Sequence, residues 1–309
     1  MGEVHELLQQ HGKLETRHRL EGRRGSRIVE AASNWLSDED QGIGYIYSGW
    51  CQTALPHKRP ADDSQPWRHD TDRITLVIHP AIRAFPGEKT EYLGVPYGAI
   101  ARLILIYLQS EALRTSSRDV ELGGSLRAFL RRLEIPVGGK TARLLREQAA
   151  RISRCTMSFQ GQFQGKSLLV NQTIVDRAIL MESEQDNLQG SLFMEYARLS
   201  EGFFNQLRQH AVPLDEAAIR HIRNSSMALD VYCWLAYRLQ SLKADRSVSW
   251  TALATQFGGG FKQRKHFKSA FTESLRLALA VYAQAKVEET PTGLLLKPSP
   301  PPVRKLIKA

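Results

Sequence analysis

The chain contains little cysteine. Its 309 residues include three cysteines, Cys51, Cys155 and Cys233, which are odd in number and far apart in the sequence. Small secreted domains that depend on disulfides carry many cysteines, usually an even number, at short spacings. The pattern therefore excludes a disulfide framework and favours reduced thiols in a cytoplasm.

The chain also has no long apolar run. Its longest apolar stretch lies around Leu103–Leu108 and is bracketed by Arg102 and Glu111, whereas a membrane-spanning helix needs about 18 or more apolar residues in succession. The first residues, 1–6, lack the basic and then apolar layout of a secretion signal. These absences predict a cytoplasmic protein with no membrane partner.

Catalytic motifs are missing as well. The nine histidines form no His-x-His pair and no His-Glu-x-x-His helix, which argues against a metal-dependent nicking enzyme and a zinc protease. The segment 138–141 resembles the end of a phosphate-binding loop, but the glycine required five positions before Gly139 is Glu134. The run 258–260 lacks the third glycine of a dinucleotide-binding motif, because that position is Gln263. We expect no catalytic residue, no metal and no cofactor, and predict that the chain is not an enzyme.

Acidic residues are nearly absent from two short basic segments. Segment 136–154 has five lysines and arginines with Glu147 as its single acid, and segment 258–276 has five with Glu273 as its single acid. Each segment therefore carries a net charge of +4 in a chain whose formal net charge is +10. Charge concentrated in this way is typical of a protein that contacts nucleic acid at two places.

The two basic segments occupy the same place in a repeated unit. Each unit has a long apolar helix, a short strand, a short helix, a glycine break, the basic helix and a glycine-turned hairpin. The short strands open at Arg118 and Arg246, and the breaks lie at 138–139 and 258–260. Helix, strand, helix, helix and hairpin is the order of a winged helix, a helix-turn-helix with a β wing.

We therefore predict an α+β fold that is mainly α with β wings, with tandem winged-helix domains and an N-terminal extension. The first wing is expected in the paired strands 156–163 and 166–175, and the second at 287–296. The expected parts are an N-terminal extension and proline-containing loop at 1–72, a first winged helix at 73–182, a connecting helix at 183–212, a second winged helix at 213–298, and a basic, proline-rich tail at 299–309. The connecting helix is expected to include Leu192, Phe193, Tyr196, Leu199 and Phe203.

The basic helix of each unit is the candidate DNA-reading element. A B-DNA major groove accepts one helix, whose exposed side must present donors to phosphates and base edges. Any surface helix also has a charged face, and this alternative is stronger for the first unit, which could instead serve dimerisation. The predicted DNA-binding residues are Lys140, Thr141, Arg143 and Arg146 in the first unit, and Lys262, Gln263, Arg264, Lys265, Lys268, Ser269, Thr272 and Arg276 in the second.

Several longer blocks resemble a known family. They are Ser48–His57, Gly94–Leu103, Tyr107–Ala112, Gly139–Thr141 and Arg146–Ile152. Together they are similar to the RepA-type plasmid replication initiators of Gram-negative bacteria, and the similarity extends from about residue 45 to the second wing.

The resemblance implies an initiator that binds double-stranded DNA at repeated origin sites, or iterons, and helps to open the adjacent duplex. It also implies recruitment of the host initiator and replicative helicase, and a balance of monomers that bind iterons with dimers that repress the initiator's own promoter. In this group the C-terminal winged helix commonly dominates groove recognition, and the N-terminal one contributes to dimerisation and additional DNA contacts.

Two alternatives remain open. A winged-helix transcription repressor without an initiation role would carry the same fold, because function depends on partners rather than on the scaffold. A nicking enzyme is disfavoured by the missing motifs. The sequence does not determine the iteron sequence and spacing, the monomer–dimer balance, the host factors, the role of residues 1–45, or whether the first winged helix mainly dimerises or binds DNA.

Overall fold

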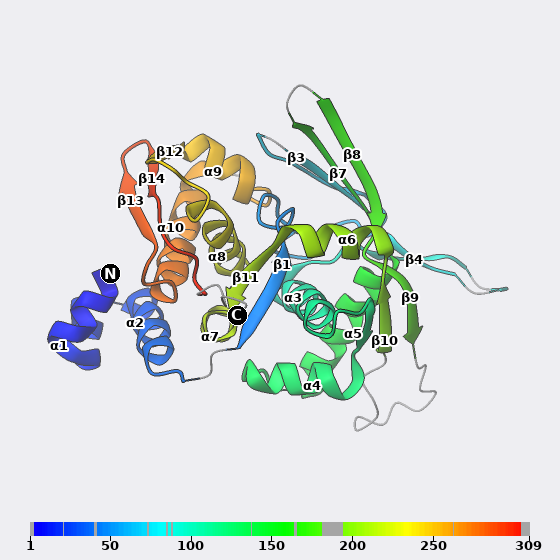
Figure 1. Cartoon of the computed structure of the whole chain (residues 1–309), viewed down its shortest axis with the longest axis horizontal. Helices are drawn as coiled ribbons and strands as arrows, with labels where there is room; N and C mark the ends of the chain where they lie inside the picture. Colours follow the sequence, from blue (N-terminus) through cyan, green and yellow to red (C-terminus); the bar gives the residue numbers. More distant parts are fainter. Residues whose placement is uncertain are drawn as a thin grey trace. The chain divides into compact units, whose positions relative to one another are not determined.

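The chain divides into two compact units, one of them discontinuous in sequence. The computed structural model describes residues 3–20, 22–39, 42–72, 74–84, 86–87, 89–136, 138–163, 166–180, 194–261 and 263–303. Unit 1 comprises residues 1–44 and 212–309, and unit 2 comprises residues 45–211. The chain passes between the units within β1 (Ile43–Tyr47) and β11 (Ala211–Asp215), which pair with each other (Figure 1).

Unit 2 is built around a buried helix, α3 (Gly98–Thr115). Nearly every side chain from Ala101 to Ser110 is buried, including the polar Arg102 and Gln109. A helix that is apolar on all sides is stable only inside a core. Around it lie α4 (Gly123–Arg132), α5 (Gly139–Arg154) and α6 (Glu201–His210).

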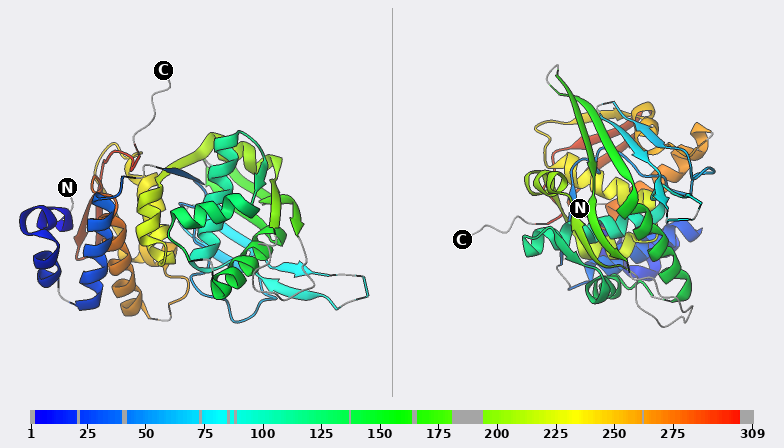
Figure 2. Two further views of the ribbon diagram at one scale, coloured as in Figure 1. Left: turned by 90° about the horizontal axis from the view of Figure 1, so that it is seen from below. Right: turned by 90° about the vertical axis from the view of Figure 1, so that its right-hand side faces the viewer.

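The strands of unit 2 form three sheets among its described residues. One has the order β2-β3-β7-β8, with β2 (Trp67–Asp70), β3 (Ile74–His79), β7 (Thr156–Phe163) and β8 (Lys166–Thr173). A second has the order β6-β10-β9, with β6 (Asp119–Glu121), β9 (Val175–Leu180) and β10 (Met194–Leu199). The third is the hairpin of β4 (Ala81–Arg83) and β5 (Glu91–Gly94), which extends away from the rest of the unit (Figure 2).

Unit 1 combines helices from both ends of the described chain. Its N-terminal part is α1 (Glu3–Arg19) and α2 (Gly22–Leu36), and its second part holds α7 (Glu216–Ile222), α8 (Ser226–Leu239), α9 (Trp250–Phe257) and α10 (Arg264–Ala280). A sheet of order β12-β14-β13 completes it, with β12 (Arg246–Ser249), β13 (Lys286–Thr290) and β14 (Gly293–Lys297). Helix α2 packs on α10 and α7 and buries Val29 and Ala32 completely.

The repeated unit predicted from the sequence is present twice as an order of elements and strand pairs. In unit 1, α8, β12, α9 and α10 are followed by the β13–β14 hairpin, and β12 pairs antiparallel with β14. In unit 2, α3, β6, α4 and α5 are followed, after an intervening hairpin, by β9 and β10, and β6 pairs antiparallel with β10. Both sheets therefore have the same order, with the short strand beside the last strand.

The location expected for the first wing was wrong. Strands β7 and β8 do form the predicted hairpin, but β7 pairs on its other side with β3 rather than with β6. The partner of β6 is β10, some 75 residues further along the chain, where Tyr196 faces Glu121 and Arg198 faces Asp119. The β7–β8 hairpin is thus an insertion between the basic helix and the strand that pairs with β6.

The helix expected across residues 192–203 is in fact a strand followed by a helix. Leu192 and Phe193 lie outside the described residues, whereas Tyr196 and Leu199 are in β10 and Phe203 is in α6. Ala197 and Leu199 are buried, and Arg198 between them is exposed, which is the two-residue alternation of a half-buried strand. Ser200 then starts α6, since its hydroxyl accepts a hydrogen bond from the backbone N–H of Phe203 at 3.2 Å.

The expected domain boundaries also differ from the units observed. Residues 1–72 do not form one extension: residues 1–44 belong to unit 1 and residues from 45 onward to unit 2, where β2 pairs with β3. The boundary near residue 212 lies close to the expected one. The whole chain is a mixed α/β structure with more strands than two wings require, because residues 43–94 contribute five of them.

Candidate nucleic-acid interface

The basic helix of unit 1, α10, is held by an aromatic core on its inner side. Phe267, Phe271 and Leu275 are at most 2% exposed. The ring of Phe271 lies 5.3 Å from that of Phe257 on α9 and 6.1 Å from that of Trp250. The helix starts at Arg264, after a glycine turn in which the N–H of Gly258 donates to the carbonyl of Ala254 at 2.8 Å. These contacts fix the inner face of α10 against α9 and leave its opposite face outward.

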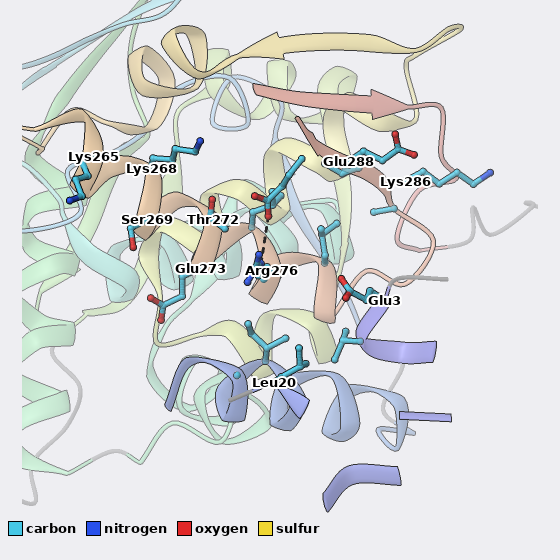
Figure 3. Close-up of a pocket in the computed structure, with 18 residues that line it drawn as sticks. Glu3, Leu20, Lys265, Lys268, Ser269, Thr272, Glu273, Arg276, Lys286 and Glu288 are labelled. Atoms are coloured by element: carbon cyan, nitrogen blue, oxygen red, sulfur yellow. Dashed lines mark ion pairs between the residues drawn. The ribbon is translucent and has the colours of Figure 1, made fainter. Parts of the chain in front are cut away.

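The outer side of α10 presents one polar stripe. Lys265, Ser269 and Arg276 are exposed and Thr272 is half-buried. Their spacing of four, three and four residues places them on one face of an α-helix, and the stripe is about 16 Å long at 1.5 Å per residue. Two hydroxyl groups therefore lie between a lysine at the first turn and an arginine near the last (Figure 3).

Three of the basic side chains on α10 are held by neighbours. The terminal nitrogen Nη2 of Arg264 donates to the hydroxyl of Thr251 at 2.5 Å. The ammonium of Lys268 lies 4.5 Å from the centroid of the Trp250 ring, within the range of a cation–π contact. The Nε of Arg276 lies 3.5 Å from Glu289 Oε1 on β13. Lys265 has no hydrogen bond or ion pair with the residues that the structure describes.

The stripe lines a groove of about 1320 Å³. Figure 3 shows α10 along the groove, with the β13–β14 hairpin on one side and α1 and α2 on the other. Leu20, Gly25 and Ile28 line it from the N-terminal helices, and Lys286, Glu288 and Glu289 from β13. The exposed face of α10 is therefore flanked on both sides by other elements of its own unit.

Three of the acids that line the groove beside the α10 stripe have a basic partner. Glu273 pairs with Arg27 of α2 at 3.2 Å, Glu288 pairs with Lys297 on β14, and Glu289 pairs with Arg276. The ion pairs partly neutralise these carboxylates. Lys265, which has no ion pair among the described residues, and Lys268, which contacts the Trp250 ring, can therefore attract an anionic ligand.

Of the other predicted residues of the second unit, two are exposed at the start of α10 and one lies outside the described residues. Gln263 and Arg264 are exposed at the start of α10, where Gln263 takes the N-cap position without making a side-chain cap. Lys262 lies outside the described residues. The structure therefore brings Gln263, Arg264, Lys265, Lys268, Ser269, Thr272 and Arg276 onto or beside one surface.

In unit 2, the predicted residues of α5 form a smaller basic surface. Lys140 and Arg143 are exposed, and Thr141 and Arg146 are half-buried. The segment's charge is not all on the surface, because Arg151 is only 2% exposed. The two segments have equal net charge, but α5 offers fewer exposed cations than α10.

Arg151 instead forms a buried network within unit 2. Its guanidinium donates to the carbonyl of Val95 at 3.0 Å and contacts Asp63 at 3.3 Å and Glu147 at 2.9 Å, and it lies 5.0 Å from the ring centroid of Tyr97. The hydrogen bond from Arg59, followed by the nearby charge of Arg151, lowers the pKa of Asp63 below its ordinary value. The role of this arginine is structural, and it joins α5 to the loop before β2 and to the residues after β5.

Several contributors to the unit 1 surface were not predicted from the sequence. Arg27, Trp250 and Glu289 are absent from the predicted DNA-binding residues, yet each contacts a side chain of α10. No local sequence pattern predicts these contacts, because each residue meets α10 only through packing between elements. The hairpin is the exception. Its strands carry opposite charges at Lys286, Glu288 and Lys297, and this pattern in the sequence indicates an ion pair across the hairpin.

Neither a metal site nor a membrane span is evident in the described part of the chain. No group of three or more His, Cys, Asp or Glu side chains there is arranged to hold a metal ion. No helix in the same ranges has the length and apolar character needed to cross a bilayer.

Comparison with known proteins identifies one family. A model of the family described as plasmid encoded RepA protein matches residues 95–253. This range begins just before α3 and ends within α9, so α10 lies beyond it. No curated protein matches the chain significantly.

Two solved structures of domains 2 and 3 of RctB are similar in fold. The first shares 12% identity over 73% of this chain and 82% of that chain, with a TM-score of 0.49. The second shares 10% identity over 80% of this chain and 94% of that chain, with a TM-score of 0.48.

Proposed function

Because the chain belongs to the family of plasmid-encoded RepA proteins, which are replication initiators, we propose that it binds repeated sites in double-stranded DNA at a plasmid origin and starts replication there. The observation that carries the proposal is the outer face of α10. It presents Lys265, Ser269, Thr272 and Arg276 in one stripe on the outward face of the helix. A stripe of cations and hydroxyls is the chemistry that contacts phosphates and base edges in a major groove.

We further propose that each unit contains a winged helix. In this interpretation α9 and α10 form the helix-turn-helix of unit 1, with β13–β14 as its wing, and α4 and α5 form that of unit 2, with β9–β10 as its wing. The matching strand orders support the proposal. Helix α10 is the main reading element, and α5, with fewer exposed cations, divides its surface between DNA and a second copy of the chain.

Initiation also needs functions beyond site binding. We propose that the bound protein promotes opening of the adjacent duplex and recruits the host initiator and replicative helicase in the bacterial cytoplasm, and that dimers repress its own promoter. The protein would act without catalysis of its own and without a cofactor. A repressor without an initiation role remains the alternative function.

Replacing Lys265 and Lys268 by alanine tests the DNA surface. The double variant should weaken binding to all duplexes, and the slope of log K against log salt should become shallower by about 2, because each lost phosphate contact contributes about 0.9 to that slope. Fluorescence anisotropy over a salt series measures both quantities, on a duplex chosen by footprinting the protein on the DNA upstream of its gene. A Lys13→Ala plus Lys243→Ala variant makes the same charge change outside the groove and should bind normally. Unchanged binding by the Lys265 and Lys268 variant would remove α10 from the interface.

A transformation assay distinguishes an initiator from a repressor. A plasmid with the origin but without this gene should replicate only when the protein is supplied in trans. Repression of a reporter without support of plasmid replication would favour the alternative function.

Incubation of the pure protein with supercoiled origin plasmid and magnesium tests the absence of catalysis. The plasmid should stay supercoiled. A nicked product would overturn the binding-only proposal.

A further inference from the structure

The Arg276 end of the α10 stripe carries a carboxylate, where DNA-binding surfaces usually avoid negative charge. Glu289 Oε1 on β13 lies 3.5 Å from the Nε of Arg276, and both side chains are partly exposed, at 38% and 61%. Both residues line the groove beside α10. A carboxylate at this place would repel a DNA phosphate and weaken binding. Its presence therefore points to a role on the neighbouring arginine, Arg276.

The neighbouring acid on the same strand has a different partner. Glu288 pairs with Lys297 on β14, whereas Glu289 pairs across to α10. Successive side chains of a strand point to opposite faces, so β13 directs one carboxylate into its own hairpin and the other onto the reading helix. Glu288 and Glu289 thus carry the same charge on the same strand, but Glu288 pairs with Lys297 and Glu289 pairs with Arg276.

The geometry of the pair favours base reading. The guanidinium nitrogen nearest the carboxylate is Nε, which is not one of the two terminal nitrogens. An arginine held through Nε keeps a terminal pair of N–H donors, and a fixed fork of donors matches the O6 and N7 acceptors of guanine in the major groove. Lysine cannot present such a fork.

The other cations of α10 are held differently. Arg264 contacts the hydroxyl of Thr251 and Lys268 contacts the ring of Trp250, so both are oriented by uncharged groups and keep their full charge. Such groups suit phosphate contacts, which position the protein but carry no sequence information directly. Among these three residues, only Arg276 is oriented by an acid.

From these contacts, we propose that Glu289 is a positioning residue that orients Arg276 toward a guanine in the target site. The inference rests on the proposed function, because it assumes that α10 enters a major groove. It assigns the β13–β14 hairpin a role in sequence specificity through α10, whereas a wing in the usual sense contributes phosphate contacts of its own.

The test measures a specificity ratio, defined as the affinity for the footprinted duplex divided by that for a duplex of scrambled sequence and equal length. The variants are Arg276→Lys, Glu289→Ala, the double variant of these two, and Glu288→Ala as the matched control. The three substituted positions are exposed, and circular dichroism checks that each variant is folded.

Arg276→Lys should lower the specificity ratio by about 5- to 150-fold, the range for one bidentate base contact, with little change in binding to scrambled DNA. Glu289→Ala should lower the ratio by at least about twofold, while binding to scrambled DNA stays equal or tightens because a negative charge is removed. The double variant should match Arg276→Lys alone, since Glu289 acts only through the arginine. Substituting each base pair of the site in turn should map the loss to one G·C pair.

Glu288 also lines the groove, but its carboxylate is held by Lys297 and not by Arg276. Glu288→Ala therefore removes the same charge from the same strand and should leave the ratio unchanged. The proposal is overturned if Glu289→Ala behaves like Glu288→Ala, or if the Glu289 and Arg276 effects on the ratio add. If the unmodified protein shows no preference for any footprinted duplex, the proposed function fails, and this result is distinct from a failure of the Glu289 inference alone.

Discussion

Arg151 shows how a basic residue in a basic segment can serve the fold. Its neighbours along α5, Lys140 and Arg143, are exposed, but Arg151 faces inward and is 2% exposed. A charge removed from water is tolerated only when hydrogen bonds and opposite charges surround it. The carbonyl of Val95 and the carboxylates of Asp63 and Glu147 provide them.

Replacing Arg151 by alanine should therefore destabilise unit 2. We expect a loss of about 3 kcal/mol, because the change removes the cation from Glu147 and the donor from the Val95 carbonyl and opens a cavity. Urea unfolding followed by circular dichroism measures the loss. Arg143→Ala, at an exposed position of the same helix, should change stability by no more than about 0.5 kcal/mol. Equal effects of the two variants would contradict the structural role of Arg151.

The cysteines give a second prediction at the scale of single residues. Cys51, Cys155 and Cys233 are all buried and are not joined in disulfides. Complete burial raises the pKa of the Cys155 thiol to about 12. The thiolate is the reactive form, so the folded protein should resist alkylation by iodoacetamide at pH 8, and the thiols should react once it is unfolded in urea. Mass spectrometry of the alkylated peptides gives the modified fraction at each position. Rapid modification of native Cys155 would show that its site opens readily.

At the scale of elements, local patterns predicted the helices and hairpins well. Helix α5 (Gly139–Arg154) begins at the expected glycine break and ends where the basic segment 136–154 ends. Strands β13 and β14 form a hairpin close to the range expected for the second wing, 287–296. These elements were predictable because glycine, proline and apolar spacing act within a few residues along the chain.

Pairings between distant segments were not predictable in the same way. Strand β6 is compatible with either β7 or β10 by its composition, and the choice of β10 depends on packing between segments far apart in sequence. The contacts of α2 with α10 and the burial of Arg151 also depend on packing between distant segments, so they could not be predicted from local patterns. In the candidate interface, the polar residues of α10 were predicted from the basic segment 258–276, whereas Glu289 and Trp250 could be placed beside them only with the structure.

The β12–β14 pair depends on a glycine at the end of the turn. A Cβ at Gly293 would lie 2.0 Å from the carbonyl oxygen of Val248, which is closer than any real contact. Gly293→Ala should therefore force β12 and β14 apart and destabilise unit 1 by about 1–3 kcal/mol. Gly260→Ala is the control, because a Cβ at Gly260 meets no atom within 4 Å. Thermal unfolding compares the two, and equal midpoints would contradict the close approach.

At the scale of the whole molecule, the reading helix depends on residues far away in sequence. Val29 and Ala32 of α2 are fully buried, and α2 packs on α10 and α7. The polar stripe of α10 is therefore supported on its inner side by the second part of unit 1 and along its edge by the first.

Deleting residues 1–44 should therefore impair unit 1 while leaving unit 2 folded. Loss of the α2 face exposes several aliphatic side chains, a cost of about 3–5 kcal/mol, and DNA binding should fall although every predicted DNA-binding residue is retained. Hydrogen exchange of α10 and α3 reports the two units separately. Leu14→Ala, at a position 77% exposed on α1, should have little effect. Full protection of α10 in the truncated chain would show that α2 is dispensable.

The division of unit 1 between two stretches of sequence also has a consequence for synthesis. A ribosome adds about 5–20 residues per second, so the interval between emergence of α2 and completion of α10 is roughly 10–50 s. During that time unit 2, which is continuous, can fold, whereas the apolar face of α2 has no partner from its own unit. The helix that we propose to read DNA is thus synthesised only after the whole of unit 2, and α2 gains its α10 partner only at that point.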